Sequence, residues 1–183
     1  MPDALESAVA ALRSGSVIAY PTEAVFGLGC DPLNATTVAQ LFALKQRPSA
    51  QGVLLIAADF DQVRDFIGVV PADALARARA TWPGPYTWVF PRSATTPAWL
   101  AGEHAGIALR VTAHPLAAQL CHAFGAALVS TSANRHGEAP ARDAAQVRAS
   151  FGDRLGYILD GATGGLEKPT PIRDAISGEF VRG

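Results

Sequence analysis

Two cations that could bind an anion stand together in the segment Lys45-Gln46-Arg47-Pro48. An arginine offers two parallel donors and a lysine offers a compact charge, so the pair suits a phosphate chain. On a continuous helix Lys45 and Arg47 would point to nearly opposite sides, but Pro48 disfavours helical geometry at Arg47 and could let them converge. The alternative is that both cations only complement the negative end of a helix dipole.

A run of small polar residues, Ser130-Thr131-Ser132-Ala133-Asn134, follows the apolar segment 126–129. In an extended chain Ser130, Ser132 and Asn134 would share one face and present three hydrogen-bonding groups in line. Such groups at the end of a buried strand suit a polar ligand such as a nucleotide or an amino acid. The same residues could instead form a local turn or cap the next segment.

Thr22 and Glu23 follow the apolar segment 17–20, which predicts a buried strand. Pro21 lacks a backbone donor and should end this strand. The two polar side chains are therefore expected on a loop at its carboxyl end, where open α/β sheets bind ligands. Ordinary packing of a strand and a turn is the alternative for this segment.

Arg110 lies on the strand predicted for residues 106–111. It shares a face with Ala108, whereas the larger apolar side chains of the strand point to the other face. An arginine beside a small neighbour could hold a carboxylate. It could equally be a charge on an edge strand.

The usual signatures of nucleotide loops and hydrolases are missing from this sequence. It has no GxxxxGK[ST] phosphate loop, no GxGxxG and no GxSxG. Its four histidines lack the spacing of metal ligands, and His122, within an apolar helical pattern, is interpreted as a packing residue. The sequence therefore argues against a metalloenzyme and a triad hydrolase, and no protein metal ligand is predicted.

The elements that must position these residues alternate along the chain. Apolar segments predict strands at residues 17–20, 52–57, 86–90, 106–111, 126–130 and 157–159, with two short strands within 171–181. Helical spacing predicts helices at residues 5–12, 34–46, 61–67, 72–82, 115–124 and 144–151, with a short helical turn at 96–100. This interleaving predicts a single α/β domain with a mostly parallel or mixed sheet.

Composition narrows the class of protein. With 49% hydrophobic and 17% charged residues, the 183-residue chain should form a compact domain. Its net charge of -1 gives no overall attraction to nucleic acid or membrane. Cys30 and Cys121 stand in apolar settings and are interpreted as reduced core thiols of a cytoplasmic protein. No apolar run is long enough to span a membrane, and the N-terminus does not read as a signal peptide.

Taken together, these segments resemble the YrdC-like family, and specifically its short bacterial threonylcarbamoyl-AMP synthases. The matching blocks follow one another from about residue 16 to 175. They are Tyr20-Pro21-Thr22-Glu23 through Gly29, Lys45-Gln46-Arg47-Pro48, Trp82-Pro83-Gly84-Pro85-Tyr86-Thr87, Leu109-Arg110-Val111 with His114-Pro115, and Ser130-Thr131-Ser132-Ala133-Asn134. A weaker block is Gly164-Gly165 followed by Ile172-Arg173-Asp174. Each block alone is common, but the ordered set is specific.

The resemblance implies one YrdC-like domain over residues 1–183, with flanking helices, a twisted open sheet, a concave ligand cavity and no additional C-terminal domain. It implies that L-threonine, bicarbonate and ATP, with Mg²⁺, yield threonylcarbamoyl-AMP and pyrophosphate. Partner proteins would then transfer the threonylcarbamoyl group to an adenosine next to the anticodon of tRNA. The nucleophile would be threonine's own carbamate, so catalysis would rest on positioning and charge stabilisation.

The resemblance also assigns roles to individual residues. The catalytic pair that neutralises the triphosphate would be Lys45 and Arg47. Threonine would be held by Thr22, Arg110, Ser132 and Thr170, with Arg110 on its carboxylate and Pro171 replacing a residue that is usually polar. ATP would be bound by Lys45, Arg47, Thr87, Ser130, Asn134 and Arg142. Glu23 would orient its loop rather than act as a base.

Two other functions remain compatible with these residues. One is an RNA-binding module, since the family's concave surface can accommodate RNA and weak RNA binding would fit it. The slightly negative charge and the lack of an aromatic-basic stacking motif argue against RNA binding as the main role. The other is a related YrdC-like enzyme that carbamoylates or adenylates a different acceptor.

Overall fold

Nine strands form one mixed sheet in the order β7-β1-β2-β6-β3-β5-β4-β8-β9 within residues 3–182, the part of the chain that the computed structural model describes. Met1, Pro2 and Gly183 lie outside the described residues. The predictions for the N-terminus and for a domain over residues 1–183 therefore include residues that the structure does not describe. The strands are β1 (Ile18–Pro21), β2 (Phe26–Gly29), β3 (Leu54–Ala57), β4 (Thr87–Pro91), β5 (Gly106–Val111), β6 (Leu128–Ser132), β7 (Tyr157–Ile158), β8 (Ile172–Asp174) and β9 (Phe180–Arg182).

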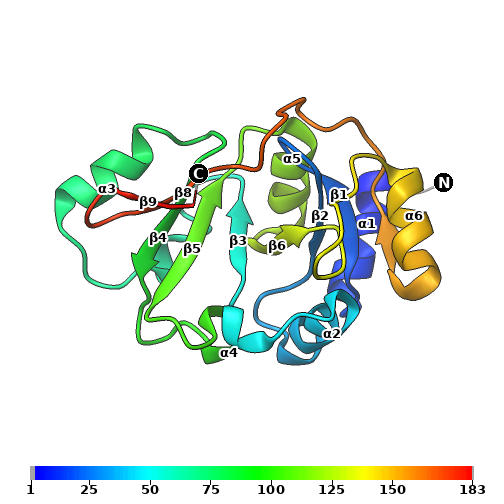
Figure 1. Ribbon diagram of the computed structural model, residues 1–183, viewed down its shortest axis with the longest axis horizontal. Coiled ribbons are helices and arrows are strands. Elements are labelled where there is room, and N and C mark those ends of the chain that lie inside the picture. Colours follow the sequence, from blue (N-terminus) through cyan, green and yellow to red (C-terminus); the bar gives the residue numbers. More distant parts are fainter. Residues whose placement is uncertain (1–2, 183) are drawn as a thin grey trace.

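Helices flank this sheet (Figure 1). They are α1 (Ala4–Arg13), α2 (Ala35–Lys45), α3 (Ala72–Arg79), α4 (Ala98–Ala101), α5 (Pro115–Phe124) and α6 (Ala144–Phe151), with short 3₁₀ turns at Ser49–Gln51, Arg64–Phe66 and Gly152–Arg154. The hairpin β8–β9 and α3 lie at one end of the molecule, and α1 and α6 lie at the other (Figure 1). No helix among the described residues is long and apolar enough to cross a membrane.

The sheet is mixed, which is one of the two arrangements that the sequence predicts. Within residues 3–182, five pairs of neighbouring strands are antiparallel and three are parallel. One cause is a hairpin that the sequence did not reveal, in which Pro21 pairs with Phe26 and the loop between them carries Thr22 and Glu23. A second is the insertion of β6 antiparallel between β2 and β3.

Glycine explains why β2 could be missed. A Cβ on Gly29 would lie 2.5 Å from the carbonyl oxygen of Val129 and 2.7 Å from the ring of Tyr20. Only a residue without a side chain lets β1, β2 and β6 approach this closely, although glycine disfavours strands. Gly29 therefore serves packing.

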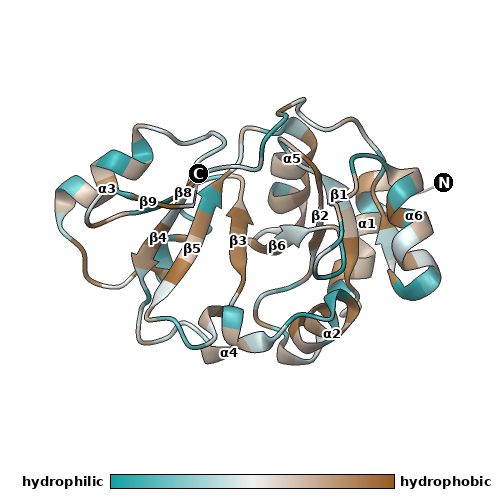
Figure 2. Ribbon diagram, in the orientation of Figure 1, coloured by the Kyte–Doolittle hydropathy of each residue, from teal (hydrophilic) through white to brown (hydrophobic). Residues whose placement is uncertain are grey.

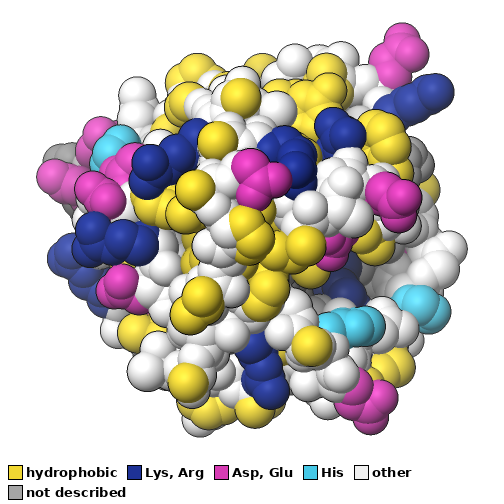
Figure 3. Space-filling model, turned by 90° about the vertical axis from the view of Figure 1, so that its left-hand side faces the viewer, with side chains coloured by type: hydrophobic (Ala, Val, Ile, Leu, Met, Phe, Trp, Pro, Cys, Tyr) yellow, Lys and Arg dark blue, Asp and Glu magenta, His cyan; other side chains and the backbone are white. Residues whose placement is uncertain are grey.

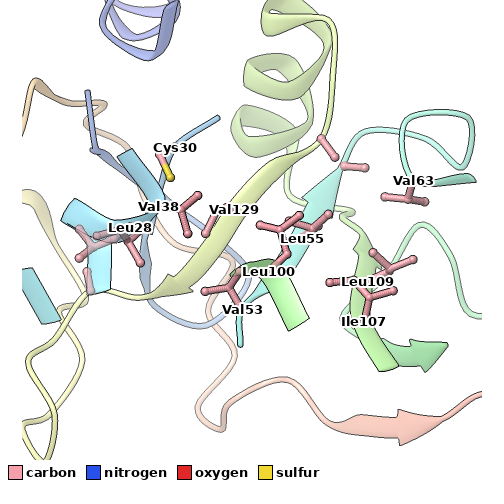
Figure 4. Close-up of a cluster of buried hydrophobic side chains, with 14 of the residues drawn as sticks. Leu28, Cys30, Val38, Val53, Leu55, Val63, Leu100, Ile107, Leu109 and Val129 are labelled. Carbon is pink, nitrogen blue, oxygen red and sulfur yellow. The ribbon is translucent and has the colours of Figure 1, made fainter. Parts of the chain in front are cut away.

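One face of the sheet carries the larger hydrophobic core. Strand residues such as Leu28, Leu55, Leu109 and Val129 pack there against side chains of α2, α3, α4 and α6. Figure 4 shows this cluster, with Val38 of α2 and Leu100 of α4 directed toward the strands. Accordingly, β3 is apolar along its length, whereas β5 has a hydrophilic end and β6 is only partly apolar (Figure 2).

The other face is covered over only part of its area. There α1 and α5 pack on alternate strand residues, among them Ile18, Tyr20, Ile56 and Leu128. Cys30 lies in the first core and Cys121 in the second. Both thiols are free and buried, as predicted, and burial raises the pKa of each to about 12.

Local signals set the helix ends that matter for the site. Asn34 caps α2 by accepting a hydrogen bond from the backbone N–H of Thr37 at 3.1 Å. The helix ends at Lys45, as predicted from Pro48, and Gln46 adopts the left-handed conformation with φ of 52°. Arg47 therefore lies outside the helix that ends at Lys45.

Two predicted helices differ from the structure. Residues 61–67 form only the 3₁₀ turn Arg64–Phe66, after which Ile67 pairs with Arg92 in an isolated bridge. The next helix ends at Arg79 instead of Trp82, whose indole N–H donates to the carbonyl of Tyr86 at 2.8 Å. A bridge to a distant residue thus follows the first of these segments, whereas a local hydrogen bond holds Trp82 beyond the end of the second. The two short strands predicted in the tail are present as β8 and β9.

Candidate functional site

A cavity of about 510 Å³ opens on the sheet face that α1 and α5 leave uncovered. Its floor includes Ser130 and Ser132 of β6 and Ala108 and Arg110 of β5. Side chains alternate along a strand, so Ser130 and Ser132 share their face with Leu128, which packs beneath α5. The same sheet face is thus core at one end and ligand cavity at the other.

Six of the residues predicted for the site line this cavity. They are Thr22, Arg47, Arg110, Ser130, Ser132 and Thr170. The structure therefore brings together residues separated by up to 148 positions, from the loop after β1, the loop after α2, two central strands and the segment before β8.

The charge of the cavity lining has one sign. Among the described residues that line it, Arg47 and Arg110 are cationic and no carboxylate is present. Thr22, Ser130 and Ser132 add hydroxyl groups to the same lining. This arrangement suits a polar ligand that carries more than one negative group.

Arg110 is a buried cation on a central strand. Because β5 lies between β3 and β4, the alternative of an edge-strand charge is wrong. Its Nη1 donates to Thr170 Oγ1 at 2.6 Å, and its Nη2 lies 3.9 Å from Glu23 Oε2. Only 4% of the residue is exposed, so its charge acts in a poorly hydrated setting, where electrostatic interactions are strong.

Arg47 is held at the cavity by the turn that follows it. Its Nε donates to Gln51 Oε1 at 2.9 Å, its Nη2 donates to the carbonyl of Gly52 at 2.9 Å, and its Nη1 donates to Thr131 Oγ1 at 3.3 Å. These bonds join the turn 49–52 to β6 and keep the guanidinium at the cavity.

Two glycines fix that turn against α4. Gly52 and Gly102 both have φ of +60°, and a Cβ on Gly52 would lie 2.7 Å from the carbonyl oxygen of Ala101. A Cβ on Gly102 would meet the carbonyl of Ala50 even more closely. The two backbones are joined by hydrogen bonds from Val53 N to Leu100 O and from Glu103 N to Ala50 O. Side chains at either glycine would push the wall apart.

Lys45 lies beside the cavity without lining it. Its Nζ donates to the backbone carbonyls of Ser132 and Asn134, the latter at 2.7 Å. Burial, assisted by the nearby charge of Arg47, lowers the pKa of Lys45 to about 8. In this conformation Lys45 anchors the polar loop after β6 and does not merely complement the end of its own helix.

The side chains of Ser130 and Thr22 both lie close to Gly27. A Cβ there would lie 3.3 Å from Ser130 Oγ and 3.4 Å from Thr22 Cγ2, so glycine keeps this part of the lining open. Thr22 Oγ1 donates to the carbonyl of Val25 at 2.7 Å, which leaves its lone pairs available to accept.

Besides Lys45, three predicted ATP-binding residues do not line the cavity. Thr87 is fully buried on β4. Asn134 donates from Nδ2 to the carbonyls of Arg135 and Glu138, both at 2.9 Å, and so folds the loop after β6. Arg142 is exposed and donates to the carbonyl of Glu167 at 2.8 Å.

Sequence reasoning gave no role to several residues that line the cavity. Polar ones are Gln51, Thr131 and His104, and Val53, Leu100 and Ala101 form part of an apolar wall. Gln51 stands four positions after Arg47, which is the only local signal for it. His104 reaches the cavity from the loop between α4 and β5, and no sequence pattern indicated that.

Comparisons with known proteins find relatives over nearly the whole chain. The family model of Sua5, YciO and YrdC, described as "Telomere recombination", matches residues 10–182. The chain belongs to the Sua5/YciO/YrdC family. It is 54% identical over 181 residues to a threonylcarbamoyl-AMP synthase of Halorhodospira halophila, covering 99% of this chain and 95% of that one. It is 52% identical over 178 residues to the enzyme of the same name from Coxiella burnetii, covering 97% and 96%.

Solved structures of the Sua5/YciO/YrdC family share the fold. Sua5 of P. abyssi in complex with L-threonine matches with a TM-score of 0.87 at 29% identity, over 95% of this chain. This chain spans 52% of that longer Sua5 chain. YciO of E. coli matches with a TM-score of 0.83 at 24% identity over 100% of this chain and 93% of its own, which supports the fold alone.

Proposed function

We propose that this protein is a threonylcarbamoyl-AMP synthase and, by reaction class, a nucleotidyltransferase. The amine of L-threonine takes up CO₂ derived from bicarbonate and loses a proton to give a carbamate. A carbamate oxygen then attacks the α-phosphorus of ATP, forming threonylcarbamoyl-AMP while pyrophosphate leaves. The observation that carries the proposal is the cavity lined by two arginines and several hydroxyls, without a carboxylate among the described lining residues.

Arg110 is the proposed partner of threonine's carboxylate. Its guanidinium faces the cavity from the sheet floor, where Ser132 and Thr22 supply hydroxyl partners for the remaining polar groups of the amino acid. Thr170, already bonded to Arg110 at 2.6 Å, borders the same pocket. A carboxylate that binds this guanidinium must share it with Thr170 or displace it.

Arg47 is the proposed partner of the phosphates, with Ser130 nearby on β6. Charge develops on the oxygens around the α-phosphorus and on the leaving pyrophosphate, and a fixed guanidinium stabilises it. We propose that Lys45 reaches the phosphates by exchanging one carbonyl partner for a phosphate oxygen when ATP binds. Until then its ammonium holds the loop after β6.

The remaining ATP contacts would require the nucleotide to extend beyond the cavity toward the loop that follows β6. Asn134 and Arg142 both lie in the segment between β6 and α6. Thr87, which is fully buried, is better placed to act through its neighbour on β5 than to touch ATP.

Mg²⁺ is proposed to enter with ATP. No group of three or more His, Cys, Asp or Glu side chains gathers to hold a metal within residues 3–182. The hydroxyls and arginines of the cavity fit an ion bound mainly by phosphate oxygens and water, as is usual for Mg²⁺. Such an ion would neutralise charge on the phosphates, whereas the protein would orient the two substrates.

The reactivity of the product indicates which partners must follow. Threonylcarbamoyl-AMP is a mixed anhydride, so it must pass quickly to an acceptor. We propose that partner proteins transfer the threonylcarbamoyl group to tRNA adenosine in the cytoplasm. Weak RNA binding by this chain stays a prediction. The face at the β8–β9 end of the molecule, for example, carries positive, negative and hydrophobic side chains together (Figure 3).

The direct test is pyrophosphate release from ATP in the absence of RNA. We expect release to require both L-threonine and bicarbonate, and a threonylcarbamoyl-AMP peak to appear by mass spectrometry. Replacing threonine by serine or other amino acids tests the acceptor. Release that is independent of threonine, or faster with another amino acid, would contradict the proposed substrate.

A further inference from the structure

Glu23 is a buried carboxylate that the proposed reaction does not use. Its residue is 6% exposed and is not among the residues that line the cavity. Its Oε1 accepts hydrogen bonds from Thr112 Oγ1 at 2.6 Å and from the backbone N–H of Ala113 at 3.2 Å. These bonds leave Oε2 directed elsewhere.

The other oxygen of Glu23 faces Arg110. Oε2 lies 3.9 Å from Arg110 Nη2 and, among the described residues, has no hydrogen-bond partner. Arg110 Nε is likewise buried without a partner in the described part of the chain. Nη1, by contrast, donates to Thr170. The guanidinium is therefore oriented from two sides, by a hydroxyl and by a carboxylate.

The strand register adds a third group around Arg110. Trp88 pairs with Leu109 in the antiparallel ladder, so the preceding residue, Thr87, falls opposite Arg110. Thr87 Oγ1 is also buried without a hydrogen-bond partner in the structure of residues 3–182. A neutral hydroxyl cannot balance the charge of Arg110, so Glu23 is the counter-charge within contact.

We infer that Glu23 is a positioning residue for the amino-acid substrate and acts through Arg110. The inference rests on the proposed function, because it takes Arg110 as the partner of threonine's carboxylate. Glu23 fixes the guanidinium in place, offsets the cost of burying its charge and leaves its cavity-facing donors for the substrate. Glu23 neither contacts substrate nor moves a proton.

The backbone of Glu23 ties this arrangement to the segment before β8. The N–H of Leu166 donates to the carbonyl of Glu23 at 3.0 Å, and a Cβ on Gly164 would lie 2.9 Å from Glu23 Cα. The same segment carries Thr170, the other partner of Arg110. In Figure 1 it crosses the molecule as an orange trace between β7 and β8. The segment before β8 thus contacts Glu23 through its backbone and carries Thr170, so it helps to hold both groups that orient Arg110.

The test uses Glu23→Gln, which keeps the shape of the side chain and an oxygen for Thr112 and Ala113. It replaces the counter-charge with an amide that can direct its N–H groups at the guanidinium. We expect the KM for threonine to rise about tenfold, and the KM for ATP to stay within about twofold. The control is Glu179→Gln, which removes an exposed carboxylate before β9 and should change neither constant.

A double-mutant cycle separates positioning from a general structural role. If Glu23 acts through Arg110, Glu23→Gln should change threonine affinity by less than about twofold in an Arg110→Ala background. An independent effect of about tenfold in that background, or an unchanged threonine KM in the single variant, would overturn the inference. If Glu23→Gln does not fold, Thr112→Val removes one hydroxyl that holds Glu23 and is carried through the same cycle, with the same outcomes.

Threonine binding to the wild-type protein is measured first by calorimetry. If wild-type protein does not bind threonine, the proposed function fails. The contact between Glu23 and Arg110 is then judged by thermal unfolding of the wild type, the two single variants and the double variant. Non-additive shifts in the unfolding midpoint support the pairing of Glu23 with Arg110, and additive shifts refute it. If wild-type protein binds threonine and Glu23→Gln binds it equally well, only the inference fails.

Discussion

Arg110 Nη1 donates a hydrogen bond to Thr170 Oγ1 at 2.6 Å, which fastens the segment before β8 to the floor of the cavity. The two residues are 60 positions apart in the chain. The bond occupies one donor of the guanidinium that we propose for threonine's carboxylate. It therefore links substrate binding to the placement of this segment.

Removing the hydroxyl of Thr170 tests that link. Thr170→Val keeps the shape but loses the acceptor, so Arg110 loses one of the groups that orient it. We expect the KM for threonine to rise roughly three- to tenfold, the range of one ordinary hydrogen bond, because Thr170 acts on threonine only through the orientation of Arg110. Thr170→Ser retains the hydroxyl and should restore the KM. An equal KM for threonine in the two variants would show that the hydroxyl of Thr170 does not contribute to threonine binding.

Replacing Arg110 itself should have a larger effect. Arg110→Ala removes the cation under the proposed carboxylate and leaves Glu23 as a buried charge without its counter-charge. We expect threonine affinity to fall by about 100-fold and ATP affinity by much less. Separate titrations of the two substrates measure this. Equal weakening of both would indicate a structural role for Arg110.

Lys45→Ala should abolish the turnover of ATP to pyrophosphate while the protein remains folded. The truncation also leaves the carbonyls of Ser132 and Asn134 without their donor. We therefore expect the free energy of unfolding to fall by about 1–3 kcal/mol. Circular dichroism checks the fold, and pyrophosphate release checks the activity. Near-wild-type turnover would exclude a role for Lys45 on the phosphates.

The lowered pKa of Lys45 predicts a pH dependence of stability. In the folded protein this pKa is about 8, against an ordinary value of 10.5 for a lysine. Between these values the unfolded chain binds more protons than the folded one, so the contribution of Lys45 to the free energy of unfolding rises with pH. Below about pH 8 both states are protonated and the contribution is flat.

Lys45→Met provides the comparison for this pH effect. Denaturant unfolding across the window should show the wild-type protein gaining stability relative to Lys45→Met as pH rises above about 8. A difference that stays constant with pH, or that shrinks, would contradict the lowered pKa.

Gly102→Ala should displace the wall that holds Arg47. The residue has φ of +60°, and the added Cβ would meet the carbonyl of Ala50. Gly137→Ala is a matched control, since Gly137 has φ of +84° with nothing within 4 Å of an added Cβ. Both variants should lose about 1–2 kcal/mol from backbone strain. Only Gly102→Ala should lose a further 1–3 kcal/mol, roughly, and show a higher KM for ATP. Equal effects would mean that the close approach is unimportant.

The sequence by itself determined the features that depend on neighbouring residues. Pro48 ended α2 at Lys45, and the alternation in 106–111 placed Arg110 opposite the apolar core. The small polar residues after an apolar strand predicted a face for a polar ligand, and of these Ser130 and Ser132 line the cavity whereas Asn134 does not. The ordered blocks, spread over most of the chain, were enough to indicate the family that the comparisons then showed.

Only the tertiary structure decided the features that depend on distant pairing. Gly27 and Gly29 are poor strand residues, and β2 exists because β1 and β6 pair with it. Lys45 is turned from the cavity by carbonyls 87 and 89 positions away. Glu23 meets Arg110 only after strands and loops have assembled. Burial and sheet order set these contacts, because a buried charge takes whichever partner the fold brings near, and no local pattern records that partner.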